Sequence, residues 1–180
     1  MLLVSNHLLY LNNKFKTSTL INISHEAVIR INVAWVKDAE ELRKYLNIKY
    51  DVFVDYPEGR NKPPIPQLSF AHTIDIIKSF KNVKYLAVSN IESGNIAGLY
   101  KRSMFNGIKF VPKIETVKGV YNLEEILQES QASHIMLDSE DLFTDCKNTQ
   151  EYIHLNDEVE LICKELKVKV LKLQGVIFSD

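Results

Sequence analysis

The sequence predicts a single α/β domain built from parallel βα units, and three observations support this. Runs rich in β-branched and apolar residues alternate with amphipathic, helix-like segments, as in sheets whose strands are covered by helices on their faces. The length of 180 residues suits one domain with one core. The chain also carries no internal repeat, low-complexity tract or linker, so residues 1–180 are interpreted as one domain.

Each predicted element rests on a local pattern. Strands are expected at the apolar runs of residues 27–33, 51–55, 85–89, 109–114, 134–137 and 168–173. Helices are expected between them, at residues 38–46, 70–80, 95–104, 122–129 and 149–166. Asp38, with Glu41 three residues later, is typical of a capping box at a helix start. Periodicity alone does not separate a closed barrel from an open doubly wound sheet.

Composition and short motifs exclude several classes of function. The 22 basic and 23 acidic residues leave a net charge of −1, so there is no basic excess for nucleic-acid binding. No stretch approaches the ~20 apolar residues of a membrane span, and the run Met1–Val4 lacks the features of a signal peptide. We therefore expect a cytoplasmic protein. The sequence contains neither a Gly-x-Gly-x-x-Gly motif after a predicted strand nor a Gly-x-x-x-x-Gly-Lys motif. Nucleotide binding through these motifs is therefore not predicted.

The cysteines and histidines do not predict a catalytic or zinc site. Cys146 and Cys163 lack the spacing of metal ligands, so both are expected to be reduced, structural thiols, with Cys163 on the apolar side of a helix. No two histidines share a His-x-x-x-His spacing. His134 begins a predicted strand and is expected to be a satisfied residue of the core or its rim.

Polar residues stand at the carboxyl ends of the predicted strands, where parallel α/β folds carry their chemistry. These residues are Arg30, Asn32, Asp55, Ser89, Lys113, Glu115, Asp138, Glu140 and Asp141. Burying a charge without a partner costs several kcal/mol, on the order of tabulated desolvation energies. Lys113, Glu115 and Arg30 are therefore expected to have ion-pair partners, a ligand or a metal.

Two interpretations of this group remain open from the residues alone. Glu115 and Asp141 are suitable oxygen ligands for Mg²⁺, which would polarise a carbonyl or stabilise an enolate oxygen. Lys113 could neutralise a phosphoryl group or the same enolate. Alternatively, the residues form a buried Lys–Glu–Asp ion network that only organises the strand ends.

The sequence resembles pyruvate kinase over residues 27–173. The resemblance is strongest where that family has a Lys-Ile-Glu strand end, a Gly-Val-x-Asn helix start and a Gly-Asp-Leu turn. The corresponding runs here are Val111-Pro112-Lys113-Ile114-Glu115-Thr116, Gly119-Val120-Tyr121-Asn122 and Asp141-Leu142. Weaker upstream matches, in the same order, are Arg30-Ile31-Asn32, Asp55-Tyr56-Pro57, Ile65-Pro66-Gln67-Leu68 and Ala87-Val88-Ser89-Asn90. Glu140-Asp141-Leu142 and Asp145 are slightly more similar to the HpcH/HpaI aldolase and citrate lyase β-subunit branch.

This resemblance implies the phosphoenolpyruvate/pyruvate-binding superfamily and a parallel (β/α) TIM-type barrel. Complete barrels usually need ~250 residues, so a small, incomplete barrel of six to seven βα units without a lid domain is expected. Both branches imply Glu115 and Asp141 as ligands of Mg²⁺ or Mn²⁺. Lys113 and Arg30 are implied as catalytic residues. The implied substrate-binding residues are Asn32, Asp55, Ser89, Ser139 and Glu140.

Departures from the kinase pattern weaken the phosphotransfer hypothesis. Its Asn-x-Ser-His-Gly becomes Asn32-Val33-Ala34-Trp35, and its Arg-Gly-Asp turn becomes Ser139-Glu140-Asp141. The lid domain is replaced by residues 59–66, and Lys172-Leu173-Gln174 stands where a Thr is expected. The resemblance also ends before the family's last barrel unit and regulatory domain.

Two functional hypotheses follow. The first is a divalent-metal-dependent enzyme that acts on pyruvate- or phosphoenolpyruvate-like oxoacids through an enolate, as a kinase-like transferase or a C–C lyase. The alternative is a catalytically inactive barrel that serves as a binding or assembly module. The expected partner is a small oxoacid or phosphorylated oxoacid, with no nucleic acid or membrane. A homo-oligomer is also expected because an incomplete parallel sheet leaves an edge that can pair with another chain.

Overall fold

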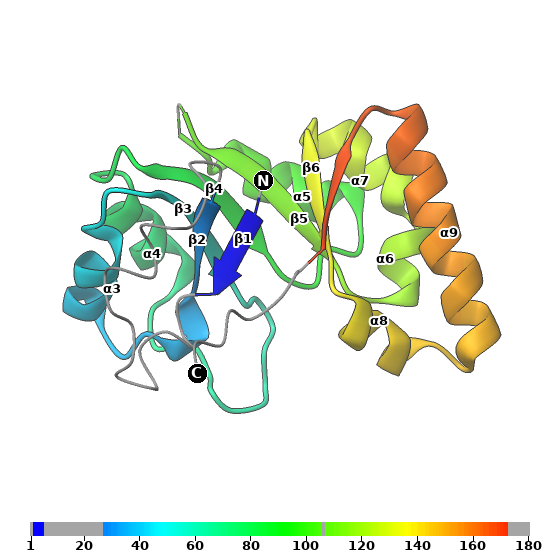
Figure 1. Ribbon diagram of the computed structural model, residues 1–180, viewed down its shortest axis with the longest axis horizontal. Coiled ribbons are helices and arrows are strands. Elements are labelled where there is room, and N and C mark those ends of the chain that lie inside the picture. Colours follow the sequence, from blue (N-terminus) through cyan, green and yellow to red (C-terminus); the bar gives the residue numbers. More distant parts are fainter. Residues whose placement is uncertain (1, 6–26, 106, 173–180) are drawn as a thin grey trace. The chain divides into compact units, whose positions relative to one another are not determined.

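The computed structural model describes residues 2–5, 27–105 and 107–172 (Figure 1). The chain divides into two compact units, and the boundary between Leu86 and Ala87 falls within one strand. The described residues up to Leu86 are called the N-terminal unit here, and those from Ala87 onward the C-terminal unit. Each unit combines parallel strands with helices.

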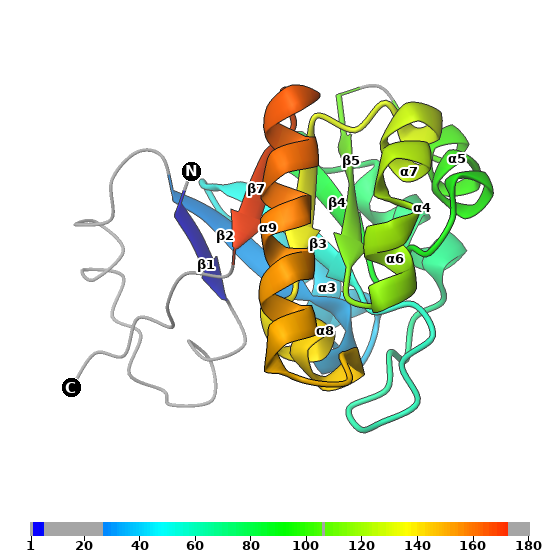
Figure 2. The ribbon, with the colours of Figure 1, turned by 90° about the vertical axis from the view of Figure 1, so that its right-hand side faces the viewer.

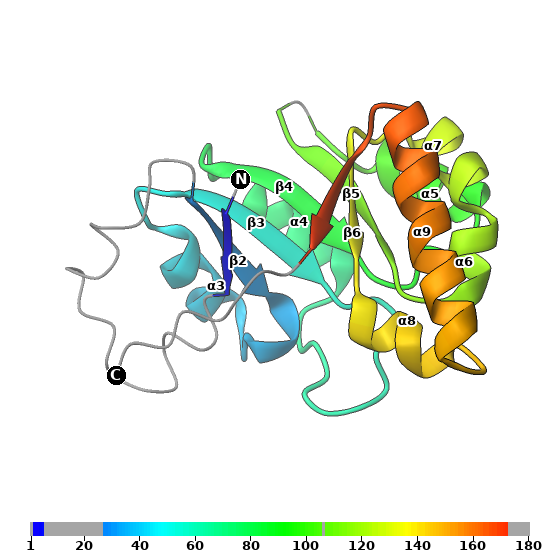
Figure 3. The ribbon, with the colours of Figure 1, turned by 45° about the vertical axis from the view of Figure 1, so that its right-hand side comes forward.

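The N-terminal unit is a parallel sheet covered by two helices. Its strands are β1 (Leu2–Ser5), β2 (Ala27–Asn32), β3 (Asp51–Tyr56) and the first part of β4 (Val83–Val88). β1, β2 and β3 lie side by side in chain order (Figure 3), with Leu3 opposite Val28 and Val28 opposite Asp51. The 3₁₀ helix η1 (Val33–Trp35) follows β2, and α3 (Ala39–Leu46) packs against α4 (Phe70–Ile77).

Local side-chain contacts explain where these elements begin and end. Asp38 accepts a hydrogen bond from the Glu41 amide at 2.8 Å and caps α3, as the sequence predicts. Asn32 accepts from the Ala34 amide at 2.9 Å and so turns the chain out of β2 into η1. Asn82 donates its amide group to the carbonyls of Leu46, Ile48 and Tyr50, which fixes the connection between α3 and β3.

The C-terminal unit continues from Ala87 with β5 (Lys109–Ile114), β6 (His134–Leu137) and β7 (Lys169–Lys172). These three strands are parallel and follow the chain order, with Ile114 opposite Leu137 and His134 opposite Lys169. The unit's helices are α5 (Gly94–Arg102), α6 (Val117–Tyr121), α7 (Leu123–Ser130), α8 (Ser139–Asp145) and α9 (Thr149–Glu165).

Helix packing in this unit follows the apolar pattern of the sequence. In α9, Leu155, Val159 and Cys163 recur every four residues and are buried, so one stripe of the helix faces the unit's core. This helix packs against α6, α7, α8 and β7 (Figure 2). α5 and α7 approach closely at Gly94, where an added Cβ would lie only 2.7 Å from the Glu125 Cγ.

The α/β class with parallel strands is confirmed, and each predicted strand corresponds to one of β2 to β7. The described strand boundaries differ from the predicted ones by about one or two residues at most. Val33 belongs to η1 and Ser89 follows β4, and the predicted strand end at residue 173 lies outside the described residues. β1, η1, α6 and α8 were not predicted. They span three to seven residues. Among the described helices, none combines the length and apolar character needed to cross a membrane.

Both cysteines are free, and Cys163 is buried on the apolar stripe of α9, as the sequence predicts. Burial, together with the negative charge of Glu160, raises the pKa of the Cys163 thiol to about 11. Since the thiolate is the reactive form, Cys163 is a packing residue.

His134 is buried at the start of β6, with its Nδ1 2.9 Å from the Ser133 hydroxyl, which confirms the prediction of a satisfied histidine. Burial, assisted by the positive charges of Lys109 and Lys169, lowers the pKa of His134 below its ordinary 6.5. The His134 imidazole therefore binds a proton more readily in the unfolded chain than in the folded chain. The contribution of His134 to the free energy of unfolding is present above pH 6.5. It is lost as the pH falls from 6.5 towards the lowered pKa of the folded state.

The corresponding test compares wild type with His134→Gln in urea denaturation at about pH 7.5 and about pH 5.5. Wild type should lose more free energy of unfolding between the two pH values than the variant. Equal losses in the two proteins would show that His134 does not contribute to the pH dependence.

Candidate metal-binding site

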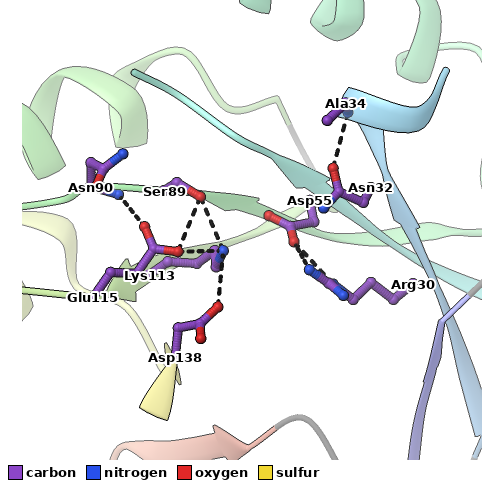
Figure 4. Close-up of polar contacts among 9 residues, drawn as sticks. All are labelled: Arg30, Asn32, Ala34, Asp55, Ser89, Asn90, Lys113, Glu115 and Asp138. Atoms are coloured by element: carbon purple, nitrogen blue, oxygen red, sulfur yellow. Dashed lines mark hydrogen bonds and ion pairs between the residues drawn. The ribbon is translucent and has the colours of Figure 1, made fainter. Parts of the chain in front are cut away.

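Polar residues gather at the carboxyl ends of the strands in the C-terminal unit (Figure 4). Ser89 and Asn90 follow β4, Glu115 follows β5, and Asp138 follows β6. Because Ile114 pairs with Leu137, the register of the two parallel strands carries Glu115 and Asp138 to equivalent positions. The site is therefore built from three consecutive strand ends of one unit.

Lys113 and Glu115 form a buried ion pair at the centre of this group. They are two residues apart, so they point to the same face of the strand. The Lys113 Nζ lies 2.6 Å from the Glu115 Oε1, and the two side chains are only 5% and 6% exposed. Ser89 accepts a hydrogen bond from Lys113 at 3.0 Å and donates one to Glu115 Oε1 at 3.4 Å. The Ser89 hydroxyl therefore bridges the Lys113 ammonium and the Glu115 carboxylate.

Asn90 orients the other oxygen of Glu115. Its backbone lies in the left-handed region, with φ of +57°, which asparagine tolerates better than most residues. In this conformation the Asn90 backbone N–H donates a hydrogen bond to Glu115 Oε2 at 2.8 Å. Both oxygens of the Glu115 carboxylate are thus held by contacts within the unit, Oε1 by Lys113 and Ser89 and Oε2 by the Asn90 backbone amide.

Glu115, Asp138 and Asp141 form a cluster of three carboxylates. Each offers one oxygen, and these oxygens all lie within 4.8 Å of one another. Asp138 precedes α8 and Asp141 lies in its first turn, so one turn of helix brings Asp141 back beside Asp138. Asp138 Oδ2 is also 3.7 Å from the Lys113 Nζ. We call Glu115, Asp138 and Asp141 the carboxylate cluster below.

The carboxylate cluster fits a hard divalent cation. Its donors are oxygens, which Mg²⁺ and Mn²⁺ prefer over nitrogen or sulfur. Three carboxylates and the Lys113 ammonium carry a formal charge of −2, which a dication would neutralise. Burial decreases from Glu115 through Asp138 to the exposed Asp141. The group thus has a buried side, and an accessible side from which ions and small ligands can enter.

A second set of contacts holds the segment that follows Glu115. The Glu92 carboxylate accepts from the Thr116 hydroxyl and from Lys118, both at 3.1 Å. The Glu92 carbonyl accepts from the Asn122 amide group at 2.8 Å. The loop after β4 is therefore fastened to both ends of α6, which limits how far Glu115 can move.

Gly119 allows α6 to lie close to this loop. A Cβ at Gly119 would stand 3.1 Å from the Ile91 carbonyl oxygen and 3.3 Å from the Thr116 hydroxyl. Asp145 reinforces the same segment because its Oδ2 accepts from the Val117 amide at 2.8 Å. Asp145 thus caps backbone here, whereas the sequence resemblance placed it in a metal-dependent pattern.

The predicted site residues of the N-terminal unit form their own polar group. Arg30 donates through Nε to Asp55 Oδ2 at 2.9 Å, and its terminal nitrogen contacts the same oxygen. Both side chains are buried, with Asp55 fully so. Asn32 caps η1 as described above. The expected partner of Arg30 is therefore a carboxylate of this chain, and contact of Arg30, Asn32 or Asp55 with a substrate stays a prediction.

The structure brings together Ser89, Lys113, Glu115 and Asp141 of the predicted residues. Ser139 and Glu140 lie at the start of α8, where Ser139 is half-buried and Glu140 is exposed. Asp138 and Asn90 were assigned no role from the residues' chemistry. For Asp138 the available signal was its position directly after a strand. The contact of Asn90 with Glu115 depends on a left-handed backbone conformation, which no sequence motif predicts.

No protein-family model and no curated protein sequence matches this chain. Solved structures do resemble it. An HpcH/HpaI aldolase/citrate lyase family protein from Burkholderia cenocepacia J2315 matches with a TM-score of 0.66 and 11% identity, over 95% of this chain and 77% of that one. RipC from Yersinia pestis matches with a TM-score of 0.58 and 14% identity, over 81% of this chain and 68% of that one.

These likenesses show a shared fold. The fold of an aldolase/citrate lyase family protein agrees with the TIM-type architecture that both resemblances in the sequence imply. A specific relationship to pyruvate kinase stays a prediction.

Proposed function

We propose that this chain is a divalent-metal-dependent enzyme of the phosphoenolpyruvate/pyruvate-binding superfamily, of the lyase or aldolase type, acting on a small oxoacid through an enolate. The fold is proposed to be one domain, an incomplete TIM-type barrel. The observation that carries the proposal is the carboxylate cluster beside buried Lys113, at the strand ends of a fold shared with an aldolase/citrate lyase family protein. Cytoplasmic location and homo-oligomer formation remain predictions.

In this proposal Glu115, Asp138 and Asp141 hold Mg²⁺ or Mn²⁺, which adds Asp138 to the ligands expected from the sequence. The bound cation would supply Lewis acidity to a substrate oxygen. Lys113 neutralises negative charge on the substrate from the buried side of the site. Ser89 orients the ammonium, and Asn90 orients Glu115. Ser139 and Glu140, next to the cluster in sequence, are proposed to contact the substrate.

Lyase-type chemistry is better supported than phosphotransfer. Phosphotransfer depends on cations placed around two phosphates, and the resemblance assigned one of these roles to Arg30. In the structure, two nitrogens of the Arg30 guanidinium already engage the Asp55 carboxylate. An arginine binds phosphate through two neighbouring guanidinium nitrogens in the same way. Asp55 therefore competes with a phosphate for these nitrogens.

The alternative function, a catalytically inactive binding or assembly module, is favoured by one observation. Lys113 lies 2.6 Å from Glu115, so the buried carboxylate has a counter-ion from the chain itself. A self-neutralised network of this kind can hold the strand ends together without any metal.

Isothermal titration of wild type with Mn²⁺ separates the two functions. Wild type should bind one ion, and Glu115→Gln should bind it more than about tenfold more weakly, since even outer-shell changes cost ~10–100-fold in metal affinity. Glu124→Gln is the matched control because it removes an exposed carboxylate of the same unit, on α7. It should bind as wild type does. Absence of Mn²⁺ binding in wild type would contradict the enzyme proposal and support the module.

A further inference from the structure

The Lys113 ammonium already occupies a cation position in the carboxylate cluster. Its Nζ lies 2.6 Å from Glu115 Oε1 and 3.7 Å from Asp138 Oδ2, so it contacts two of the three clustered carboxylates. Its side chain is 5% exposed. The two carboxylates it contacts are the more buried members of the cluster.

We propose that Lys113 is a built-in counter-cation that exchanges with the metal: a dication binds Glu115 only as Lys113 leaves it, and the displaced ammonium then binds the anionic group of the substrate. This inference rests on the proposed function. It adds a specific role for Lys113, which is to set the affinity for the metal and to couple metal binding to binding of the oxoacid.

Electrostatics favour the exchange. Two cations that share one carboxylate oxygen at contact distance repel each other, and the repulsion is strong in a buried site where water screens little. Glu115 Oε1 contacts the Lys113 ammonium at 2.6 Å, and Oε2 accepts from the Asn90 backbone amide. A dication that binds this carboxylate therefore stands close to the ammonium, and we expect the ammonium to withdraw from Oε1.

Lysine is suited to withdraw. Its ammonium is a point charge on a flexible four-carbon stem, unlike the rigid fork of arginine. Ser89 Oγ accepts from Lys113 at 3.0 Å and provides a hydrogen-bond acceptor that can retain the ammonium once Glu115 is lost. The ammonium then stays inside the site and does not return to solvent.

The charge balance indicates the class of ligand. The three carboxylates and Lys113 carry a formal −2, and a dication brings the group to zero. A small oxoacid adds one carboxylate, and the displaced ammonium is the cation positioned to meet it. The site therefore favours small oxoacids that present an anionic oxygen to this ammonium, with the metal bound first.

The first test measures Mn²⁺ affinity by titration calorimetry in wild type, Lys113→Gln and Lys118→Gln. Glutamine removes the positive charge from position 113 and keeps a hydrogen-bond donor. Lys118 is a matched control because it is a 65% exposed lysine of the same unit that pairs with Glu92. Lys113→Gln should bind Mn²⁺ at least about tenfold more tightly than wild type, because the variant lacks the cation that competes with Mn²⁺ at contact distance. Lys118→Gln should match wild type.

The second test measures oxalate, an enolate mimic, on the Mn²⁺-loaded proteins. Lys113→Gln should bind oxalate at least about tenfold more weakly than wild type does, by loss of a charge-assisted contact. Opposite changes in the affinities for Mn²⁺ and oxalate support the exchange, because a purely structural role for Lys113 moves neither in this pattern. Equal Mn²⁺ affinity in wild type and Lys113→Gln, or unchanged oxalate affinity, overturns the inference and leaves the metal site intact. Failure of all proteins to bind Mn²⁺ overturns both the proposed function and the inference.

A measurement on wild type covers the case in which Lys113→Gln does not fold. The ammonium resonance of Lys113 is followed by NMR in ¹⁵N-lysine-labelled protein during titration with diamagnetic Mg²⁺. The resonance should change until the metal site is saturated and return on addition of a chelator. A Lys113 resonance that stays unchanged at saturating Mg²⁺ overturns the inference.

Discussion

Replacing Arg30 with methionine is expected to lower the free energy of unfolding by about 3–5 kcal/mol, because it removes the arginine that pairs with the buried Asp55 carboxylate. Asp55 is fully buried, and Arg30 contacts it through two nitrogens. Methionine fills much of the volume of the arginine stem and provides no positive charge. Urea denaturation of wild type and Arg30→Met measures the difference.

Lys78→Met is the control for loss of an ion pair as such. Lys78 pairs with Asp75 at 3.0 Å on the surface of α4, where both side chains are well exposed, so its loss should cost less than about 1 kcal/mol. The double variant Arg30→Met/Asp55→Leu should recover most of the stability, since both charges are removed. A loss below about 1 kcal/mol in Arg30→Met would show that Asp55 does not depend on this partner.

Replacing Glu115 with leucine is the second change with a large expected effect. It leaves the Lys113 ammonium buried, with Asp138 at 3.7 Å as its remaining carboxylate contact in the cluster. The free energy of unfolding should fall by about 3–5 kcal/mol. Thermal and urea unfolding in the presence of a chelator measure this loss without any contribution from bound metal.

The double variant Lys113→Met/Glu115→Leu shows whether the pair serves stability or function. Replacing a buried ion pair by apolar residues is often neutral or stabilising by about 1–4 kcal/mol. We therefore expect the double variant to be at least as stable as wild type and to bind no Mn²⁺. A double variant as unstable as Glu115→Leu would show that the pair itself holds the strand ends together, in agreement with the alternative of a structural network.

The sequence predicted those features that depend on neighbours along the chain. Alternating apolar runs predicted β2 to β7, and the expected position of Cys163 on the apolar side of a helix agrees with the buried stripe of α9. The Asp38 cap was predictable because its partner, Glu41, lies three residues away. Lys113 and Glu115 were predictable as neighbours for the same reason, since residues two apart on a strand share a face.

Tertiary structure decided which of the polar residues meet. Arg30 and Asp55 are 25 residues apart, and their ion pair depends on the position of β2 beside β3. Asp138 joins Glu115 through the register of β5 and β6. Asn90 reaches Glu115 only through a left-handed backbone. Periodicity indicates which face of an element is buried, whereas packing between distant segments sets strand register and loop conformation. The sequence by itself therefore determined the elements and their charged residues. Only the folded chain determined the carboxylate cluster.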